Sequence, residues 1–172
     1  MKKTIITYGA SVLRQKAEKI SANDKYQELI ANLFDSLNTD EGIGLAAPQL
    51  GVAKRVFVTA IPQPTDSEGP KTFVRKAWIN PEIITISSIK NTYCEGCLSI
   101  PGIFEEVLRP ESLVVRYYNE DLQPVEEEIS DLEARVFQHE FDHLEGILFT
   151  DKINPLKRKL LGGKLRKIKN NA

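Results

Sequence analysis

Hydrophobic side chains recur on almost every side of one late segment, residues 130–146, when it is read as a helix. The apolar positions are Leu132, Ala134, Val136, Phe137, Phe141 and Leu144. Ser130 and Glu133 have the spacing of an N-terminal capping box, and Gly146 suits the position that follows the last helical turn. A helix that is apolar all round belongs in the interior of a protein. The pattern therefore predicts a buried central helix of about four turns.

The rest of the chain predicts strands and two further helices. Residues 24–37 have helical periodicity, with one apolar side made of Leu29, Ile30, Leu33, Phe34 and Leu37. Strand-like runs occupy residues 55–61, 83–86, 103–107, 113–118 and 125–129, and a polar loop is predicted at 62–70. Asn154 and Pro155 predict the start of a last helix, which the Gly162-Gly163 pair would weaken. Because the strands precede the central helix as a group, we expect an α+β fold, with antiparallel sheets packed around that helix and a helix at the C-terminus.

Length and composition favour a single domain over residues 1–172. The chain is 41% hydrophobic and 27% charged, which is typical of a soluble protein. No apolar run approaches the roughly 20 residues of a membrane helix, and residues 1–7 lack the apolar core of a signal peptide. We therefore expect a cytoplasmic protein with no membrane partner, in which both cysteines are reduced.

The net charge of −1 hides a basic C-terminal segment, residues 152–172. This segment has eight Lys and Arg residues and no Asp or Glu, so it carries +8 and leaves −9 for the remainder of the chain. If Leu156, Leu160 and Leu165 pack on the body of the protein, the segment also contributes to stability. Such a segment is either a solvated helix face or a surface that contacts nucleic acid.

The two histidines of the chain, His139 and His143, lie four residues apart on the predicted central helix. Residues at i and i+4 share one face of a helix, so the two imidazoles can bind one metal ion, and Glu140 can reach a water on that metal. A catalytic metal needs a third protein ligand. The C-terminal segment has no acid, so this ligand lies upstream or is Glu145 or Asp151, which are too close along the chain to reach the histidine face easily.

Cys94 and Cys97 are the upstream candidates, and three interpretations are open. Both could complete a closed Cys2His2 structural site, they could form a redox pair, or one could bind metal while the other packs in the core. No thioredoxin-like pattern surrounds them, which disfavours the redox pair. Residues three apart in a strand point to opposite faces, so both could bind metal only if Gly96 turned the chain. We therefore favour Cys97 as the single upstream ligand.

Three motifs together resemble the peptide deformylase family. They read Gly42-Ile43-Gly44-Leu45-Ala46-Ala47-Pro48-Gln49, Glu95-Gly96-Cys97-Leu98-Ser99 and His139-Glu140-Phe141-Asp142-His143, in the order that the family has them. The similarity extends from Val12 to Phe149. It implies a metal-dependent hydrolase that removes the N-formyl group from the N-terminal formylmethionine of newly made polypeptides and releases formate.

The resemblance also implies a role for individual motif residues. The implied metal ligands are Cys97, His139 and His143. They would hold one divalent metal ion per chain, expected to be Fe2+, with Zn2+, Ni2+ or Co2+ as alternatives. Glu140 would be the general acid/base as the metal-bound water attacks the formyl carbon. Gln49 and the backbone N–H of Leu98 would stabilise the oxyanion.

Four residues are candidates for substrate binding. The resemblance implies that Gly44 lies against the substrate, and a glycine allows such a close approach. Val136 and Leu132 precede His139 by one and two helical turns, so together with Ile43 they could line an apolar pocket for the methionine side chain.

The chain departs from the family pattern at one position. Some family members have an arginine seven residues after the ligand cysteine, where it helps to hold the peptide, and this chain has Phe104 there. Arg109 matches a second arginine of the pattern. The resemblance further directs the nucleic-acid interpretation of the C-terminal segment to ribosomal RNA, not DNA.

Two other functions are open at this point. A zinc endopeptidase is supported by the HExxH motif and weakened by the missing downstream ligand. A non-catalytic protein with a closed site of both cysteines and both histidines is the second. The substitution Cys94→Ser separates these interpretations, because a closed structural site would lose its metal and a deformylase would keep it.

Overall fold

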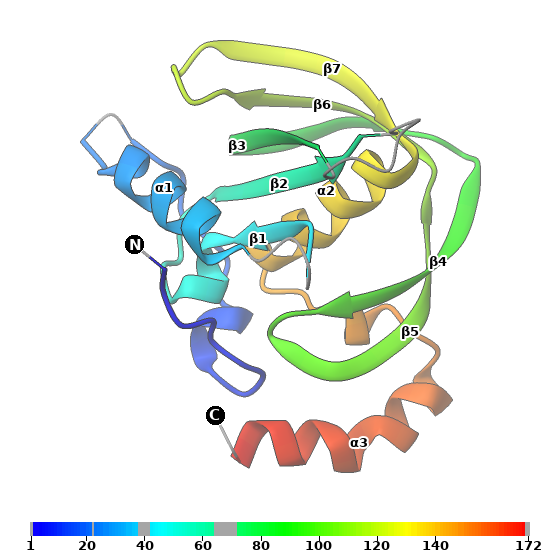
Figure 1. The fold of residues 1–172 in the computed structure, drawn as a ribbon. Helices are drawn as coiled ribbons and strands as arrows, with labels where there is room; N and C mark the ends of the chain where they lie inside the picture. The colour runs from blue at the N-terminus through cyan, green and yellow to red at the C-terminus, as the bar shows by residue number, and fades with distance from the viewer. Residues whose placement is uncertain (1, 22, 38–41, 64–71, 171–172) are drawn as a thin grey trace.

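The computed structural model describes residues 2–21, 23–37, 42–63 and 72–170. Its helices are α1 (Tyr26–Ser36), α2 (Asp131–Leu144) and α3 (Pro155–Asn170), with short 3-10 turns at Ser11–Arg14, Ala47–Leu50 and Phe149–Asp151. Its strands are β1 (Gly44–Ala46), β2 (Val56–Pro62), β3 (Phe73–Ile86), β4 (Lys90–Cys97), β5 (Ile100–Pro110), β6 (Ser112–Tyr118) and β7 (Pro124–Ser130). The expected α+β class, with antiparallel sheets and a C-terminal helix, is confirmed (Figure 1).

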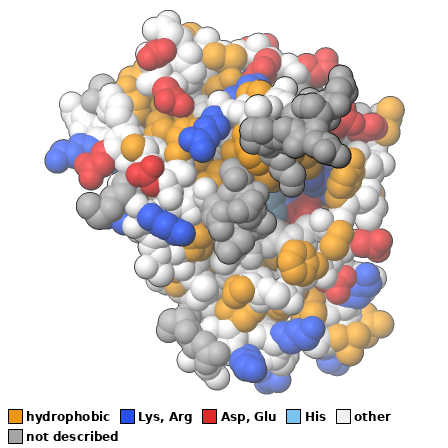
Figure 2. Space-filling view, viewed as in Figure 1, with side chains coloured by type: hydrophobic (Ala, Val, Ile, Leu, Met, Phe, Trp, Pro, Cys, Tyr) orange, Lys and Arg blue, Asp and Glu red, His pale blue; other side chains and the backbone are white. Residues whose placement is uncertain are grey.

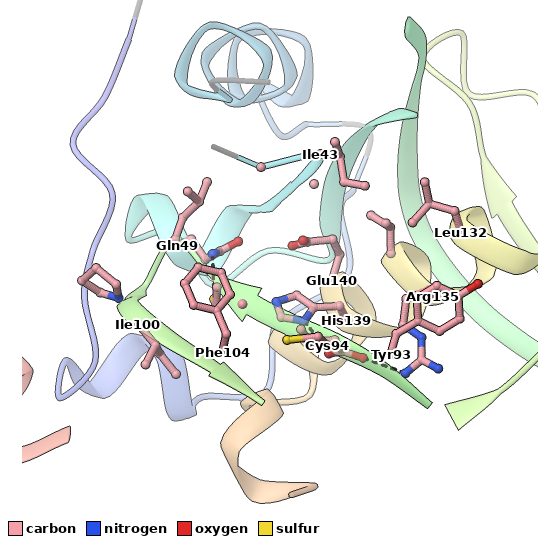
Figure 3. A pocket seen from close by; sticks show the side chains of 18 of the residues that line it. Ile43, Gln49, Tyr93, Cys94, Ile100, Phe104, Leu132, Arg135, His139 and Glu140 are labelled. Carbon is pink, nitrogen blue, oxygen red and sulfur yellow. Dashed lines mark hydrogen bonds and ion pairs between the residues drawn. The ribbon is translucent and has the colours of Figure 1, made fainter. Parts of the chain in front are cut away.

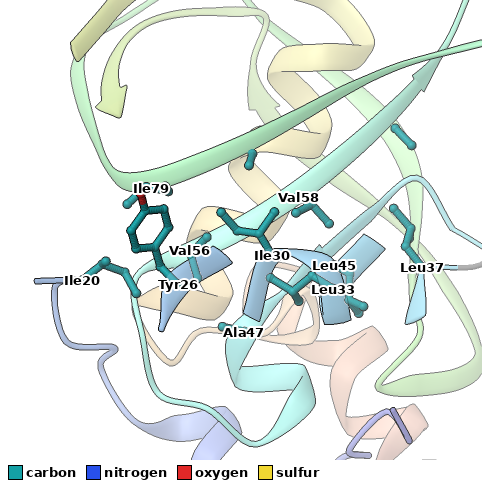
Figure 4. Close-up of a cluster of buried hydrophobic side chains, with 12 residues drawn as sticks. Ile20, Tyr26, Ile30, Leu33, Leu37, Leu45, Ala47, Val56, Val58 and Ile79 are labelled. Carbon is teal, nitrogen blue, oxygen red and sulfur yellow. The ribbon is translucent and has the colours of Figure 1, made fainter. Parts of the chain in front are cut away.

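The main sheet is antiparallel and has the strand order β1-β2-β3-β6-β7. Successive side chains of a strand point to opposite faces, so β2 serves two hydrophobic clusters at once. Val56 and Val58 pack against Ile30 and Leu33 of α1 on one face (Figure 4). Phe57 packs against α2 on the other face. The main sheet is therefore covered by α1 on one side and by α2 on the other.

Helix α2 is buried, as its apolar pattern predicts. Phe137 lies edge-on to Phe57 and to Trp78 of the main sheet, with ring centroids 5.3 Å and 5.0 Å away. Another side of α2 faces the second sheet, the two-stranded β4–β5 hairpin. The helix thus lies between the two sheets (Figure 1), and its side chains contact both of them.

The β4–β5 hairpin in turn rests on α3. Ile103 and Val107 of β5 share a hydrophobic cluster with Leu165 of α3, so Leu165 packs on the body of the protein. Leu156 and Leu160 are 68% and 77% exposed, because the side of α3 that meets the body is the one that carries Leu165. None of the helices among the described residues is long and apolar enough to cross a membrane.

The ends of α2 agree only in part with the caps predicted from the sequence. Gly146 has φ +71°, so it adopts the left-handed conformation expected just after a helix. The expected capping box is wrong. The Ser130 hydroxyl bonds to Asp131, and the Glu133 carboxylate is 2.8 Å from the ammonium of Lys76 in β3. Glu133 thus pairs with Lys76 of β3 and does not cap the N-terminus of α2.

Strands with regular apolar patterns were predictable, and those without were not. The predicted strands at 103–107, 113–118 and 125–129 fall within observed strands, the one at 55–61 begins one residue before β2, and the predicted run at 83–86 is only the end of β3. β1 and β4 had no predicted counterpart. The one fully buried residue of β4 is the acid Glu95, so the strand shows no apolar alternation. Most of the loop predicted at 62–70 lies outside the described residues.

Candidate metal centre and active site

The side chains that the sequence predicts as ligands come together between α2 and the hairpin. His139 and His143 project from α2, and Cys97 is the last residue of β4. The ligand atoms of the three residues all lie within 4.8 Å of one another. The Cys97 Sγ is 3.3 Å from the His143 Nε2. One thiolate and two imidazoles form a donor set that suits zinc or ferrous iron, so the residues fit a single divalent metal ion.

The competing ligand candidates are engaged elsewhere. Glu145 pairs with Arg55 and Lys16, and Asp151 pairs with Arg14. Neither acid belongs to the metal-capable group found among the described residues.

Cys94 also lies outside that group, which argues against a closed Cys2His2 site. Its expected place in the core is wrong as well, because the Cys94 side chain is exposed at the edge of a cavity. Most side chains of β4 point to solvent or to that cavity, so this strand offers no core position to a cysteine.

Glu95 orients the first histidine. Its Oε2 is 2.9 Å from the His139 Nδ1, which fixes the ring and leaves Nε2 for a metal. Its carboxylate also accepts hydrogen bonds from Arg109, at 2.7 and 2.9 Å, and from Arg135, at 2.8 Å. This role of Glu95 was not predicted from the sequence. The signal was available, because a metal-binding histidine usually needs an acceptor for its other ring nitrogen.

Glu140 lines the same cavity as His139 and is 4% exposed. Among the described residues, no group forms a hydrogen bond with its Oε2. Burial raises the pKa of the Glu140 carboxyl to about 7. Gly44 leaves the space that this side chain occupies, because a Cβ on Gly44 would lie 2.5 Å from the Glu140 Oε1. A carboxyl in this setting can both accept and donate a proton near neutral pH.

Gln49 is buried and held in one orientation. Its Oε1 accepts a hydrogen bond from the Ala46 backbone N–H at 2.8 Å. Its Nε2 donates to the Ser99 hydroxyl at 3.2 Å and to the Cys97 Sγ at 3.6 Å. The amide donor therefore points to the ligand sulfur. Leu98 follows Cys97 at the turn of the hairpin and lines the same cavity.

A cavity of about 690 Å³ opens over these groups. All four residues predicted to contact substrate line it: Ile43, Gly44, Leu132 and Val136. Figure 2 shows a histidine (pale blue) at the bottom of a hollow in this face of the molecule. The cavity wall also includes Tyr93, Phe104 and Arg135, which Figure 3 shows around His139 and Glu140. Tyr93 and Arg135 were not predicted from the sequence as part of the wall.

Arg109, the second arginine of the family pattern, points away from the substrate cavity. It is 3% exposed and bonds to Glu95 and, at 2.7 Å, to Asp142 of α2. Phe104 is 68% exposed at the cavity edge, where its ring covers Gly96. The position that is arginine in some relatives therefore offers an apolar surface here.

Comparison with known proteins agrees with this geometry. A family model described as polypeptide deformylase matches residues 2–159. The chain belongs to the peptide deformylase family. A peptide deformylase from Pseudothermotoga lettingae is 44% identical over 169 residues, covering 98% of this chain and 92% of its own length. One from Christiangramia forsetii is 42% identical over 172 residues, covering 95% of this chain and 88% of its own.

Solved structures of deformylases have the same fold. A plant peptide deformylase superimposes with a TM-score of 0.86 at 32% identity, over 98% of this chain and 90% of that one. A peptide deformylase from Legionella pneumophila gives a TM-score of 0.84 at 34% identity, over 99% and 97%. The protein is thus a metal-dependent hydrolase that removes the N-formyl group from nascent peptides, and the endopeptidase interpretation falls away.

The two cysteines offer a matched test of the ligand set. Cys97→Ser should lose most of the bound metal, as should His139→Ala and His143→Ala, because each removes one of three donors. Cys94→Ser should keep the metal, since its side chain lies outside the group. Metal content is measured by atomic absorption after gel filtration. A fully loaded Cys97→Ser protein, or a metal-free Cys94→Ser protein, would overturn the assignment.

The contact between Gly44 and Glu140 predicts a second effect. Gly44→Ala should keep the metal and lower kcat by roughly tenfold or more, equivalent to ~1.4 kcal/mol, because the added methyl displaces the Glu140 carboxylate. Gly162→Ala is the control, since a Cβ there meets nothing within 4 Å. This variant should keep kcat and gain up to ~1 kcal/mol of stability in urea unfolding. Equal kcat for both variants would contradict the proposed contact.

Proposed function

We propose that this deformylase uses Glu140 as its general acid/base and Gln49 with the Leu98 N–H as its oxyanion donors. One observation carries the proposal: the buried Glu140 carboxylate, with an oxygen that has no hydrogen-bond partner among the described residues, lines the same cavity as the candidate ligands Cys97 and His139. When bound, a divalent metal supplies a Lewis acid that polarises the formyl carbonyl and lowers the pKa of water. The protein side chains then move protons, stabilise charge and position the peptide.

The Glu140 carboxylate accepts a proton from the attacking water and later donates it to the leaving amine. A group that performs both tasks works best when its pKa lies near the operating pH. Burial raises the pKa of Glu140 to about 7, which supports this role. Because Gly44 has no side chain, the Glu140 carboxylate can lie at this position in the cavity.

Gln49 and Leu98 stabilise the negative charge that develops on the formyl oxygen. The Gln49 amide now donates to the Cys97 sulfur over 3.6 Å, a long bond that it can exchange for a bond to the oxyanion. The contacts to Ala46 and Ser99 hold the amide in place during this exchange. One such donor is worth about 3–4 kcal/mol in the transition state.

The methionine side chain of the substrate lies against Ile43, Leu132 and Val136. These apolar residues line the cavity beside His139 and Glu140, and Figure 3 shows Ile43 and Leu132 on one side of it. An unbranched apolar side chain fits a wall of this kind, whereas an acid loses its hydration there without gaining a partner. Gly44 lets the peptide backbone approach closely.

Fe2+ is proposed as the native metal, with Zn2+, Ni2+ or Co2+ as substitutes. A thiolate and two imidazoles suit any of these ions, and the choice of Fe2+ rests on the family resemblance. We also propose that the protein is a single catalytic domain. We place it in the cytoplasm, where its formylated peptide substrates are made.

Helix α3 is proposed to contact ribosomal RNA. The basic segment 152–172 carries eight Lys and Arg residues and no acid. Lys159, Lys164 and Lys167 are exposed on α3, while Leu165 anchors the helix to the body. Positive side chains on an anchored helix favour contact with a phosphate backbone.

Replacing the carboxylate tests the proton transfer. Glu140→Gln should keep the metal, because Glu140 is not a ligand, and should lose most of the turnover of formyl-Met-Ala. A loss of about 10²–10⁴-fold is typical when a general acid/base is removed. Metal content and kcat are measured on the same preparation. Wild-type turnover by the variant would eliminate the general-base role.

Substrate choice tests the apolar pocket. Formyl-Met peptides should exceed formyl-Asp peptides in kcat/KM by well over tenfold, or more than about 1.4 kcal/mol. The comparison uses matched dipeptides that differ only in the first side chain. Equal kcat/KM values would refute the pocket.

The ribosome contact is tested without removing α3, because the packing of Leu165 would be lost with the helix. Replacing Lys159, Lys164 and Lys167 by Gln should weaken co-sedimentation with ribosomes at low salt and leave hydrolysis of formyl-Met-Ala unchanged. Replacing Lys2, Lys25 and Lys90 by Gln removes the same charge elsewhere and should have less effect. Equal binding by both variants, or no binding by the wild type, would leave α3 as a solvated helix.

A further inference from the structure

The metal centre is divided between two parts of the fold. His139 and His143 belong to α2, which packs on the main sheet, whereas Cys97 belongs to the separate β4–β5 hairpin. No strand pairing joins the two sheets within the described residues. The distance between the cysteine and the histidines therefore depends on what ties the hairpin to α2.

Two buried arginines supply such ties, beside the Glu95–His139 contact and a hydrogen bond from the Gln138 Nε2 to the Pro110 carbonyl. Arg109 of β5 reaches Asp142, next to His143, at 2.7 Å. Arg135 belongs to α2, where it precedes His139 by one helical turn. Whereas Arg109 reaches from the hairpin to α2, Arg135 reaches from α2 to the hairpin. Arg135 and Asp142 lie about two turns apart on α2, so the two arginine ties hold the hairpin at separate points of the helix.

Arg135 makes four hydrogen bonds to the hairpin. Its Nη1 donates to Glu95 at 2.8 Å and to the Val107 carbonyl at 2.9 Å. Its Nη2 donates to the Asn91 side chain at 2.6 Å and to the Asn91 carbonyl at 2.9 Å. The guanidinium also lies 5.0 Å from the ring centroid of Tyr93. One side chain from α2 thus holds both strands of the hairpin.

We infer that Arg135 is a positioning residue that sets Cys97 against His139 and His143, and so controls how tightly and in what geometry the metal is held. Arg135 acts through Glu95, whose other oxygen orients His139, and through the strand that ends at Cys97. Lysine is a poor substitute, because one ammonium lacks the planar fork that reaches four acceptor groups at once. The inference rests on the proposed metal centre.

The test compares metal binding by full-length Arg135→Leu, Arg135→Lys and Arg116→Leu proteins. Arg116 is the control, because it pairs with Glu126 on the neighbouring strand and is exposed. Each protein competes with a chromophoric chelator for Zn2+ or Co2+ at 25 °C. Loss of a residue that orients metal ligands should raise the dissociation constant roughly 10–100-fold in Arg135→Leu. Arg135→Lys should lie between that variant and the wild type.

Spectroscopy of the Co2+ proteins separates positioning from simple stabilisation. The sulfur-to-cobalt absorption band should shift in both Arg135 variants and stay unchanged in Arg116→Leu. Wild-type affinity and an unshifted band in the Arg135 variants, even with a lowered Tm, would overturn the inference and leave the metal centre intact. If Arg135→Leu does not fold, the same criteria apply to Arg135→Lys. A wild-type protein that binds no metal would refute the centre itself and the inference with it.

Discussion

The buried carboxylate of Glu95 is the interaction on which the active site depends. Moving a carboxylate out of water costs several kcal/mol, and only close, well-directed partners offset that cost. Burial pulls the pKa of Glu95 upward, but hydrogen bonds from Arg109 and His139 outweigh it and lower the pKa far below its usual range. The charge is therefore kept at neutral pH. Arg109 belongs to the same hairpin as Glu95, whereas the other partners, His139 and Arg135, are in place only when α2 and the hairpin have docked.

The two sheets contribute differently to this arrangement. The main sheet, packed between α1 and α2, is stabilised by hydrophobic burial around Phe57, Trp78 and Phe137. The hairpin reaches α2 through charged groups, chiefly the ties made by Arg109 and Arg135. Apolar packing is tolerant of small shifts, whereas hydrogen bonds between charged groups are directional. The part of the fold that must place Cys97 accurately is thus the part held by directional contacts.

The metal ligands were more predictable from the sequence than the residues that position them. The spacing of His139 and His143 on an apolar helix is visible in the sequence, and the choice of Cys97 followed from strand geometry and family resemblance. The contact of Arg135 with the hairpin could not be predicted, because an arginine on a mostly apolar helix can equally well extend to solvent. Its partners in the hairpin are far away in sequence, and no periodicity records such a contact.

The secondary structure was likewise predictable only in part. Strands with one apolar face, such as β6 and β7, were predicted, because a half-buried strand leaves a period of two. β4 was not predicted, because it lacks an alternating apolar pattern and instead carries Tyr93, Glu95 and two cysteines at the active site. The capping box at Ser130 was expected and is absent, since Lys76 of a neighbouring strand attracts Glu133. Local rules thus failed where tertiary charges or the active site took precedence.

The central claim is that one metal ion, held between α2 and the hairpin, is required for hydrolysis. The direct measurement is the metal content of protein purified without oxygen, followed by titration of chelator-stripped protein with Fe2+ while turnover of formyl-Met-Ala is recorded. We predict about one metal ion per chain and turnover that rises in proportion to occupancy, reaching its maximum at one equivalent. Full turnover by the metal-free protein, or full occupancy without any turnover, would contradict it.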